Sequence, residues 1–579
     1  MHNRTLPLTA VALTALTSTV VLAPRAAEAC GCFAPPDPTV PVVQAGERIV
    51  FARDGEDVVA HIQIQYQGEA SEFGWLLPLP SVPEMSLGTE ELFTRILQTT
   101  QPRYRLNRIA GQACEFGFPG RGGIAFGAGA PSDAANESAR DDDGPLVIED
   151  SIGPYDYAVL RADSRDEMFD WLNDNRYFIP TGTDDVVGPY IRPGAYFLAL
   201  KLRKGNDAGD IQPVVLRYPS ELPMIPIILT SVAATPEMGV QVWVLGEHRA
   251  IPRNYRHTIL NEQHIDWFDA GANYPEVVVR ATNEAPEGQA FVTEYAGSSQ
   301  VMVNQLDWAG RFAVSDPTDP GSRRQARAEL EAIEDPTQLA VRIGQLGFPD
   351  SSNFRGVLSR HYDYPGALAE RGIAEEDFYR SLGYFLTRYR EVEAPEVFEG
   401  YDLDGVDPAQ VVADLWERVV EPTLEAGALF RQFPKMTRMI TTLSPEEMTR
   451  DPVFSFNPDL PDVSNEHEAT FEYRCEPEQD GPDRTPGVLT LTDGRRIYVP
   501  NPSRYGEAQV SELPYSRRIE QLREEGTPVV EIDNEPLLRG EGGCTCALSR
   551  PGSGRTASGL GLALTLAGAL GLMLARRRR

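Results

Sequence analysis

The chain ends in an apolar segment that limits where the rest of it can fold. Residues 559–575 carry no charge and are mostly Leu, Ala and Gly, and four arginines follow at 576–579. At 1.5 Å per residue, such a helix spans roughly 26 Å, close to the thickness of a bilayer core. The arginines stay cytoplasmic under the positive-inside rule. The sequence therefore predicts a transmembrane helix at 559–575, a single-pass anchor with the preceding chain outside the inner membrane.

The N-terminus has the pattern of a secretory signal peptide. Residues 1–29 contain a positively charged start, an apolar Thr-rich middle and the small-x-small tripeptide Ala27-Glu28-Ala29. We expect signal peptidase to cut between Ala29 and Cys30. The alternative, a lipoprotein acylated at Cys30, is less favoured because Ala27 and Glu28 do not fit a lipoprotein signal.

The tail, residues 541–579, combines a Cys-Thr-Cys motif, a loose spacer, the apolar span and the arginines. This order resembles the myxobacterial C-terminal sorting tail, MYXO-CTERM. The resemblance implies that an envelope sorting protease cuts near a cysteine and that the protein moves to the cell surface. Cys544 or Cys546 is then the processing site, and the motif leaves the choice open. A metal or redox role for the pair is the weaker alternative.

The charge of the chain excludes one large class of function. It holds 85 Asp and Glu against 53 Lys and Arg, a formal net charge of -32. A surface this acidic repels phosphate backbones, so we expect no nucleic-acid partner. The length, 579 residues, and the 41% hydrophobic content allow two to four folded domains.

Four cysteines lie outside the tail: Cys30, Cys32, Cys114 and Cys475. An exported protein folds in an oxidising compartment, so all four are disulfide candidates, with three complete pairings possible. A bridge between Cys30 and Cys32 would be strained, so we expect at least one of them to reach Cys114 or Cys475. A metal site is the less favoured alternative, because no CxxC spacing is present.

The first half of the body has strand patterns mixed with short helices. Residues 58–66 alternate strictly, which predicts a half-buried strand, and 74–77 continue as a strand that should stop at Pro78 and Pro80. Thr89 and Ser164 each open a short helix as N-caps. Residues 117–144 are rich in Gly, Ala, Ser and Asp and predict a flexible loop. Further strand-like runs occur at 196–202, 227–232, 240–245 and 289–295.

The second half of the body has helical patterns in place of most of the strand patterns. Helical spacing occurs at 326–346, 373–389 and 407–420, the last with Asp407 as N-cap and a proline at N1. A hairpin is predicted at 487–499 around Asp493 and Gly494. The fold class is therefore α+β. Its predicted parts are a β-rich domain with short helices at 30–310, a mainly helical region at 320–453, a small β-hairpin region at 454–540 and the tail with its transmembrane helix.

The search for chemistry finds no GxSxG, HExxH, P-loop or paired CxxC motif. We therefore predict no catalytic residues, no metal and no cofactor. The weak exception is His248 and His257, which could converge with Glu294; their spacing imposes no shared face, so surface or hydrogen-bonded roles are favoured. Three tryptophans could stack on sugars, but their spacing favours burial: Trp75, Trp243 and Trp267.

Several phrases of the body are similar to a known family: QAGERI at 44–49, HIQIQYQG at 61–68, FGWLLPLP at 73–80, LPMIP at 222–226, RAIPRNY at 249–255, AFVTEYAG at 290–297 and LSPEEM at 443–448. Together they resemble the bacterial domain-of-unknown-function family DUF2330. The resemblance covers the body from Cys30 to about His467. It implies no activity, because that family has no assigned reaction or catalytic residues.

Two functions follow as expectations. The first is a non-enzymatic binding or structural protein of the cell envelope or outer surface, with a polysaccharide or a protein as its ligand. The alternative is an extracytoplasmic hydrolase with an unrecognised site, built on His248, His257 and Glu294. Converging carboxylates and histidines would favour the hydrolase.

Overall fold

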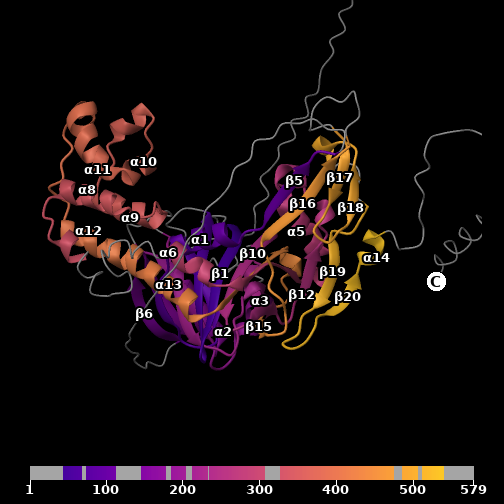
Figure 1. Cartoon of the computed structure of the whole chain (residues 1–579). Coiled ribbons are helices and arrows are strands. Elements are labelled where there is room, and N and C mark those ends of the chain that lie inside the picture. The colour runs from indigo at the N-terminus through magenta and orange to yellow at the C-terminus, as the bar shows by residue number, and fades with distance from the viewer. Residues whose placement is uncertain are drawn as a thin grey trace, which may run out of the picture. The chain divides into compact units, whose positions relative to one another are not determined.

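Figure 1 shows the computed structural model of the chain. It describes residues 43–67, 73–111, 145–177, 184–203, 211–232, 234–306, 327–474, 485–505 and 512–539. The predicted signal peptide, the loop at 117–144, all six cysteines and the segment 559–575 lie outside these residues. Within the described part of the chain, no helix is both long and apolar enough to cross a membrane. The chain divides into two units, 1–535 and 536–579, and the first is described below.

A ten-stranded mixed sheet forms the centre of the first unit. Two neighbouring pairs, β1 with β10 and β12 with β13, are parallel, and the other pairs are antiparallel. From edge to edge the strands are β20 (Val529–Asp533), β19 (Ser516–Gln521), β12 (Arg256–Leu260), β13 (Ala290–Ser298), β14 (Lys435–Leu443), β10 (Ala234–Gly246), β1 (Val43–Asp54), β2 (Asp57–Gln67), β9 (Val214–Pro219) and β4 (Glu84–Leu87).

Both faces of this sheet are covered, because its strands carry apolar side chains on alternate sides. The predicted strand at 58–66 is β2: Val58 and Ala60 face one core, and Val59 faces the other. The first face packs on a second, four-stranded sheet. Its order is β3 (Gly74–Leu79), β8 (Tyr196–Leu202), β7 (Tyr155–Arg161) and β6 (Leu146–Ile152).

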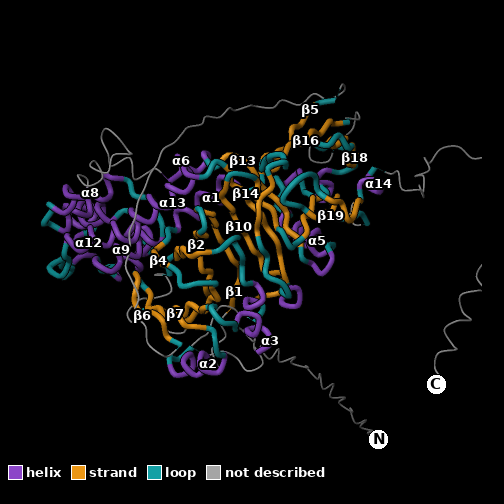
Figure 2. Tube along the Cα trace, turned by 90° about the horizontal axis from the view of Figure 1, so that it is seen from below, coloured by secondary structure: helices purple, strands orange, loops and turns teal. Residues whose placement is uncertain are grey.

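Helices complete the layers. α1 (Glu90–Thr100), α6 (Gln300–Leu306) and α13 (Glu421–Gln432) pack on the second face of the large sheet. α2 (Arg165–Asp174) and α3 (Asp184–Val187) cover the outer face of the small one. The order of layers is helix, sheet, sheet, helix, and Figure 2 shows α1, α6 and α13 on one side of the central strands and β6, β7 and α2 on the other.

Local signals explain several of these elements. Thr89 caps α1 by accepting from the backbone N–H of Glu91, and Ser164 caps α2 by accepting from that of Glu167, as predicted. Of the two prolines expected to stop this strand, Pro78 does not, since β3 continues to Leu79, the residue before Pro80. Because β3 is the edge strand of its sheet, proline's missing N–H breaks no ladder there.

The predicted strand at 227–232 is also wrong. Residues Ile227–Thr230 form one helical turn, α4, after Pro226. The carboxylate of Asp451 accepts from the backbone N–H of Ile228 at 3.0 Å and satisfies this helix start from a distant part of the chain. Residues 227–230, a run rich in β-branched side chains, are thus helical because of a tertiary contact with Asp451, which the local sequence pattern cannot predict.

Residues 330–420 are mainly helical and enclose a core of their own. The single helix expected at 326–346 is divided, because Asp335 caps a new helix with Pro336 at its first position. Asp407 caps α12 as predicted. The elements of this region include α8 (Pro336–Leu346), α9 (Ser352–His361), η8 (Gly366–Arg371), α10 (Glu375–Arg380), α11 (Leu382–Tyr384), the π-helical η9 (Phe385–Glu393), η10 (Pro395–Phe398), α12 (Pro408–Leu415) and the π-helical η11 (Trp416–Val420), which leads into α13.

A further four-stranded sheet has the order β18 (Arg496–Val499), β17 (Gly487–Thr490), β16 (Glu466–Tyr473) and β5 (Arg103–Ile109). β17 and β18 are the predicted hairpin, and Gly494 in its turn has φ +80°. α5 (Tyr274–Asn283) contributes Val277 to the core of this sheet. The remaining pair is β11 (Arg249–Pro252) with β15 (Phe454–Asn457), and the last helix is α14 (Glu535–Leu538).

The α+β class predicted from the sequence is confirmed. The large sheet takes strands from all three predicted regions of the body, 30–310, 320–453 and 454–540. β14, which follows the helices, lies between β13 and β10 in the middle of the sheet. The segment before the helices and the segment after them therefore build one core.

Candidate ligand-binding cavity

A cavity lies between the large sheet and the small one. It holds about 970 Å³ of atom-free space, including the part that opens to solvent. Strands β1, β2 and β9 supply one wall, and β3 supplies another. The segment 220–226, which follows β9, completes the lining.

The floor of the cavity is apolar. Ile49, Phe51, Ala60, Trp75 and Leu216 line it, and each is at most 5% exposed in the whole chain. They meet because alternate residues of β1, β2 and β9 point to the same face and β3 lies opposite. Such a surface binds apolar groups through the hydrophobic effect.

Tyr218 brings a hydroxyl to this lining without bringing a charge. Burial raises the pKa of the Tyr218 hydroxyl, so the group stays protonated at neutral pH. The carboxylate and the guanidinium of the lining belong to Glu47 and Arg192.

Glu47 and Arg192 differ in environment. Glu47 is half-buried, and one of its carboxylate oxygens accepts a hydrogen bond from the Thr230 hydroxyl at 2.9 Å. Arg192 is exposed, as is Pro80, and these two residues mark the mouth of the cavity. The site thus combines an apolar floor with a carboxylate, Glu47, and with a guanidinium, Arg192, at its entrance. Gln63, Gln65 and Ser220 add uncharged polar groups to the lining.

The residues proposed from the sequence for a hydrolase are held in different places. His248 is exposed in the turn between β10 and β11. His257 is buried on β12, and neither ring nitrogen has a hydrogen-bond partner among the described residues. Burial, and then the charge of Arg249, lower the pKa of His257 to about 3, so the ring is neutral.

Glu294 is already occupied by other groups. Its carboxylate accepts from Arg438 Nε at 2.5 Å and from the Tyr274 hydroxyl at 2.6 Å. The described contacts therefore join Glu294 to an arginine and a tyrosine and not to His248 or His257. Within the described residues, no group of three or more His, Cys, Asp or Glu side chains is placed to hold a metal ion.

Comparison with known proteins gives one match. The sequence profile of a family described as an uncharacterized protein conserved in bacteria, DUF2330, matches residues 24–355. The chain belongs to the DUF2330 family. No curated protein and no solved structure matches it. The matched segment ends in α9, so it is shorter than the resemblance to about His467 that the sequence phrases indicated, and it stops before β14.

The phrases that carry the DUF2330 resemblance surround the cavity. The phrase at 44–49 contributes Glu47 and Ile49, the one at 61–68 contributes Ile62, and the one at 73–80 contributes Trp75. The phrase at 222–226 contributes Leu222, Met224, Ile225 and Pro226. Four separate stretches thus meet at one place, and all four lie inside the matched segment.

The sequence patterns do not predict this cavity, although they predict that Trp75 is buried, which is confirmed at 4% exposure. Trp243 and Trp267 are buried as expected too, at 0% and 1%. The alternation in β2 shows that one of its faces is apolar. It does not show which distant strand lies opposite or that the two surfaces leave a space.

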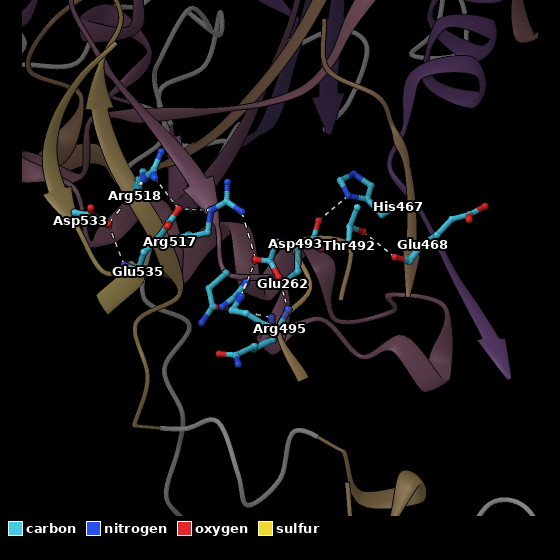
Figure 3. A network of polar contacts seen from close by, with 12 residues as sticks. Glu262, His467, Glu468, Thr492, Asp493, Arg495, Arg517, Arg518, Asp533 and Glu535 are labelled. Carbon is cyan, nitrogen blue, oxygen red and sulfur yellow. Dashed lines mark hydrogen bonds and ion pairs between the residues drawn. The ribbon is translucent and has the colours of Figure 1, made fainter. Parts of the chain in front are cut away.

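A second group of polar residues was missed for a similar reason. His467 and Glu262 are far apart in the chain but 2.8 Å apart in space, and the His467 ring stacks on Tyr104 with centroids 4.7 Å apart. Figure 3 shows this pair beside a chain of alternating charges in which Asp493 contacts Arg495 at 2.7 Å and Arg517 at 3.5 Å. The opposite charges are paired with one another. We therefore assign the network a structural role, in which it holds the β17–β18 hairpin against β19.

Proposed function

We propose that this DUF2330 protein is an exported, surface-anchored, non-enzymatic binding protein and that the cavity between its two sheets is its ligand site. The observation that supports this most is the apolar floor, which four phrases of the family resemblance surround. A polysaccharide needs many hydrogen-bonding groups, whereas Ile49, Phe51 and Leu216 supply none. We therefore propose an apolar ligand in place of the polysaccharide or protein expected from the sequence.

The apolar surface that the cavity leaves unpacked supports the same proposal. Protein interiors are close-packed, and a void forfeits contacts that the surrounding side chains could make. Apolar surface of the lining that faces the open side of the cavity is exposed to water, which is unfavourable. An apolar ligand would recover roughly 25 cal/mol for each Å² of apolar surface removed from water.

Export and anchoring form the other part of the proposal. The signal peptide at 1–29, the span at 559–575 and the arginines at 576–579 support an extracytoplasmic protein with a single-pass anchor in the precursor. Sorting through Cys544 or Cys546 and disulfides among the four body cysteines belong to it as well. Intact-mass analysis of the mature envelope protein would report both cleavage sites, any lipid and the number of oxidised thiols.

The hydrolase gains no support from its proposed residues. The Glu294 carboxylate is held by Arg438 and Tyr274, and His248 lies on the surface. A hydrolase needs its base and nucleophile within hydrogen-bond reach of each other. We therefore keep ligand binding as the proposed activity.

Binding of a neutral fluorescent probe, N-phenyl-1-naphthylamine, to the full chain tests the site. We expect saturable binding of one probe per chain. Ile62→Trp would fill the cavity and weaken binding by about tenfold or more, a loss of at least ~1.4 kcal/mol. Ile148→Trp is the matched control, since Ile148 is another partly buried isoleucine packed on the same core but does not line the cavity.

The control should bind the probe with an affinity within about twofold of that of the parent chain, a difference of about 0.4 kcal/mol. Both variants are compared with the parent by thermal melting, so that a loss of fold is seen directly. Absence of saturable binding, or an equal effect of both substitutions, would contradict the proposed site.

A further inference from the structure

We infer that the ligand of this cavity is a free long-chain carboxylic acid, with its alkyl chain on the apolar floor and its carboxylate at Arg192. The inference rests on the proposed function and adds the chemical class of the ligand. It depends on two features of the lining, the charge at the entrance and the absence of charge at the floor.

Arg192 lies at the entrance, in the loop between the turn Gly188–Tyr190 and β8. It is exposed, and its guanidinium forms no ion pair with any described residue. Other described arginines also form no ion pair with a described residue, Arg53 among them, whereas Arg217 contacts Asp54 at 2.8 Å and Asp57 at 3.2 Å. Arg192 differs from Arg53 in its position, because it lines the cavity. An arginine left without a carboxylate beside an apolar opening is suited to a carboxylate brought by the ligand.

Glu47 is the group that opposes this assignment. Its carboxylate would attract a cationic head, but the Thr230 hydroxyl already donates to it, and the residue is only half-exposed. Arg192 is the more exposed of the two charges. A head group that remains in water at the mouth therefore meets the arginine first, and we assign the anionic head on this ground.

The floor indicates what the rest of the ligand is. Ile49, Ala60 and Leu216 present only alkyl groups, and Trp75 adds an aromatic ring. A ligand with polar groups along its length would leave those groups without hydrogen bonds on this floor, which is unfavourable. An unbranched alkyl chain avoids this cost.

The test compares three amphiphiles that share one chain length and differ in the head: dodecanoate, dodecanol and dodecyltrimethylammonium. Each displaces N-phenyl-1-naphthylamine from the full chain at low ionic strength. An exposed ion pair contributes about 0.2–1 kcal/mol, so dodecanoate should bind up to about fivefold more tightly than dodecanol. Added salt should remove this preference.

Arg192→Gln should abolish the preference for dodecanoate over dodecanol, while Arg192→Lys should keep part of it. Arg53→Gln is the control, because Arg53 is an exposed arginine of β1 that does not line the cavity. Equal affinities for all three heads, tighter binding of the cation, or a preference that survives in Arg192→Gln would overturn the inference and leave the cavity's function standing. A failure of the probe itself to bind would overturn both.

Discussion

Glu294 on β13 and Arg438 on β14 form an ion pair of 2.5 Å, and their side chains are only 1% and 3% exposed. The second carboxylate oxygen accepts from the Tyr274 hydroxyl at 2.6 Å. Arg438 also donates to the Thr100 hydroxyl at 3.2 Å, and its guanidinium lies 5.2 Å from the centre of the Trp243 ring. The pair therefore ties together two strands that the whole helical region separates in sequence.

Removing one partner of this pair should destabilise the protein strongly. Arg438→Met leaves the Glu294 carboxylate buried without its counter-charge, at an expected cost of about 3–5 kcal/mol in the free energy of unfolding. The double variant Arg438→Met with Glu294→Met should recover part of that loss, because no charge then remains buried. Urea denaturation measures both.

Arg280→Met is the control for this experiment. Arg280 pairs with Glu276 at 2.7 Å, but both side chains are more than half exposed, so the expected cost is below about 1 kcal/mol. Equal losses for Arg280→Met and Arg438→Met would show that burial of the Glu294 pair adds nothing to its contribution.

Two buried histidines should make the protein lose stability in acid. Burial lowers the pKa of His61 to about 4, and burial together with Arg249 lowers that of His257 to about 3. Below about pH 6.5 the unfolded chain binds protons that the folded chain does not, so their contribution falls as the pH falls. For each histidine, the free energy of unfolding should fall by up to about 1.4 kcal/mol per pH unit as the pH falls from 6 to 4.

The variant His257→Leu isolates one of these contributions. Its stability should decline less steeply than that of the parent chain between pH 6 and 4. Glu520 lies opposite His257 in the sheet, and burial raises the pKa of its carboxyl, which acts in the reverse direction. Because Glu520 is present in both proteins, the difference in slope reports His257. Identical slopes would mean that His257 is protonated in the folded state.

A chain cut at the end of the family match should not fold. Residues 30–355 contain β10 and β13 but lack β14, which separates them in the large sheet. We expect no cooperative thermal transition for 30–355 and a clear one for 30–539. A cooperative transition of 30–355 at the temperature of the longer chain would show that the strands from 435 onward are dispensable.

The turn of the small hairpin gives a local test. Gly494 has φ +80°, and a Cβ there would meet no atom within 4 Å, so only backbone strain opposes a side chain. Gly494→Ala should cost about 1–2 kcal/mol. Gly405 has the same open space without the positive φ, so Gly405→Ala should be close to neutral in the same denaturation experiment.

Local structure was predictable where the physical cause is local. The caps at Thr89 and Asp407 depend on one side chain and the next few backbone amides. The alternation of β2 and the turn at Gly494 likewise need no distant partner. In each case the short-range pattern and the tertiary fold favour the same conformation.

The failures have a common cause in long-range contacts. α4 begins where Asp451 reaches it, and β3 passes through Pro78 because no strand pairs with its outer edge. The cavity depends on the separation of two sheets. Its lining comes from residues 46–226, and no single segment of the chain contains the pattern.

Quenching of Trp75 by a brominated fatty acid tests the central claim most directly, because bromine quenches a tryptophan ring that it contacts. Trp75 lines the cavity, and the chain holds six tryptophans in all. We predict a saturable loss of fluorescence in the parent chain that is absent in Trp75→Phe, with probe binding retained in that variant. The same loss in both proteins would place the ligand elsewhere and contradict the account.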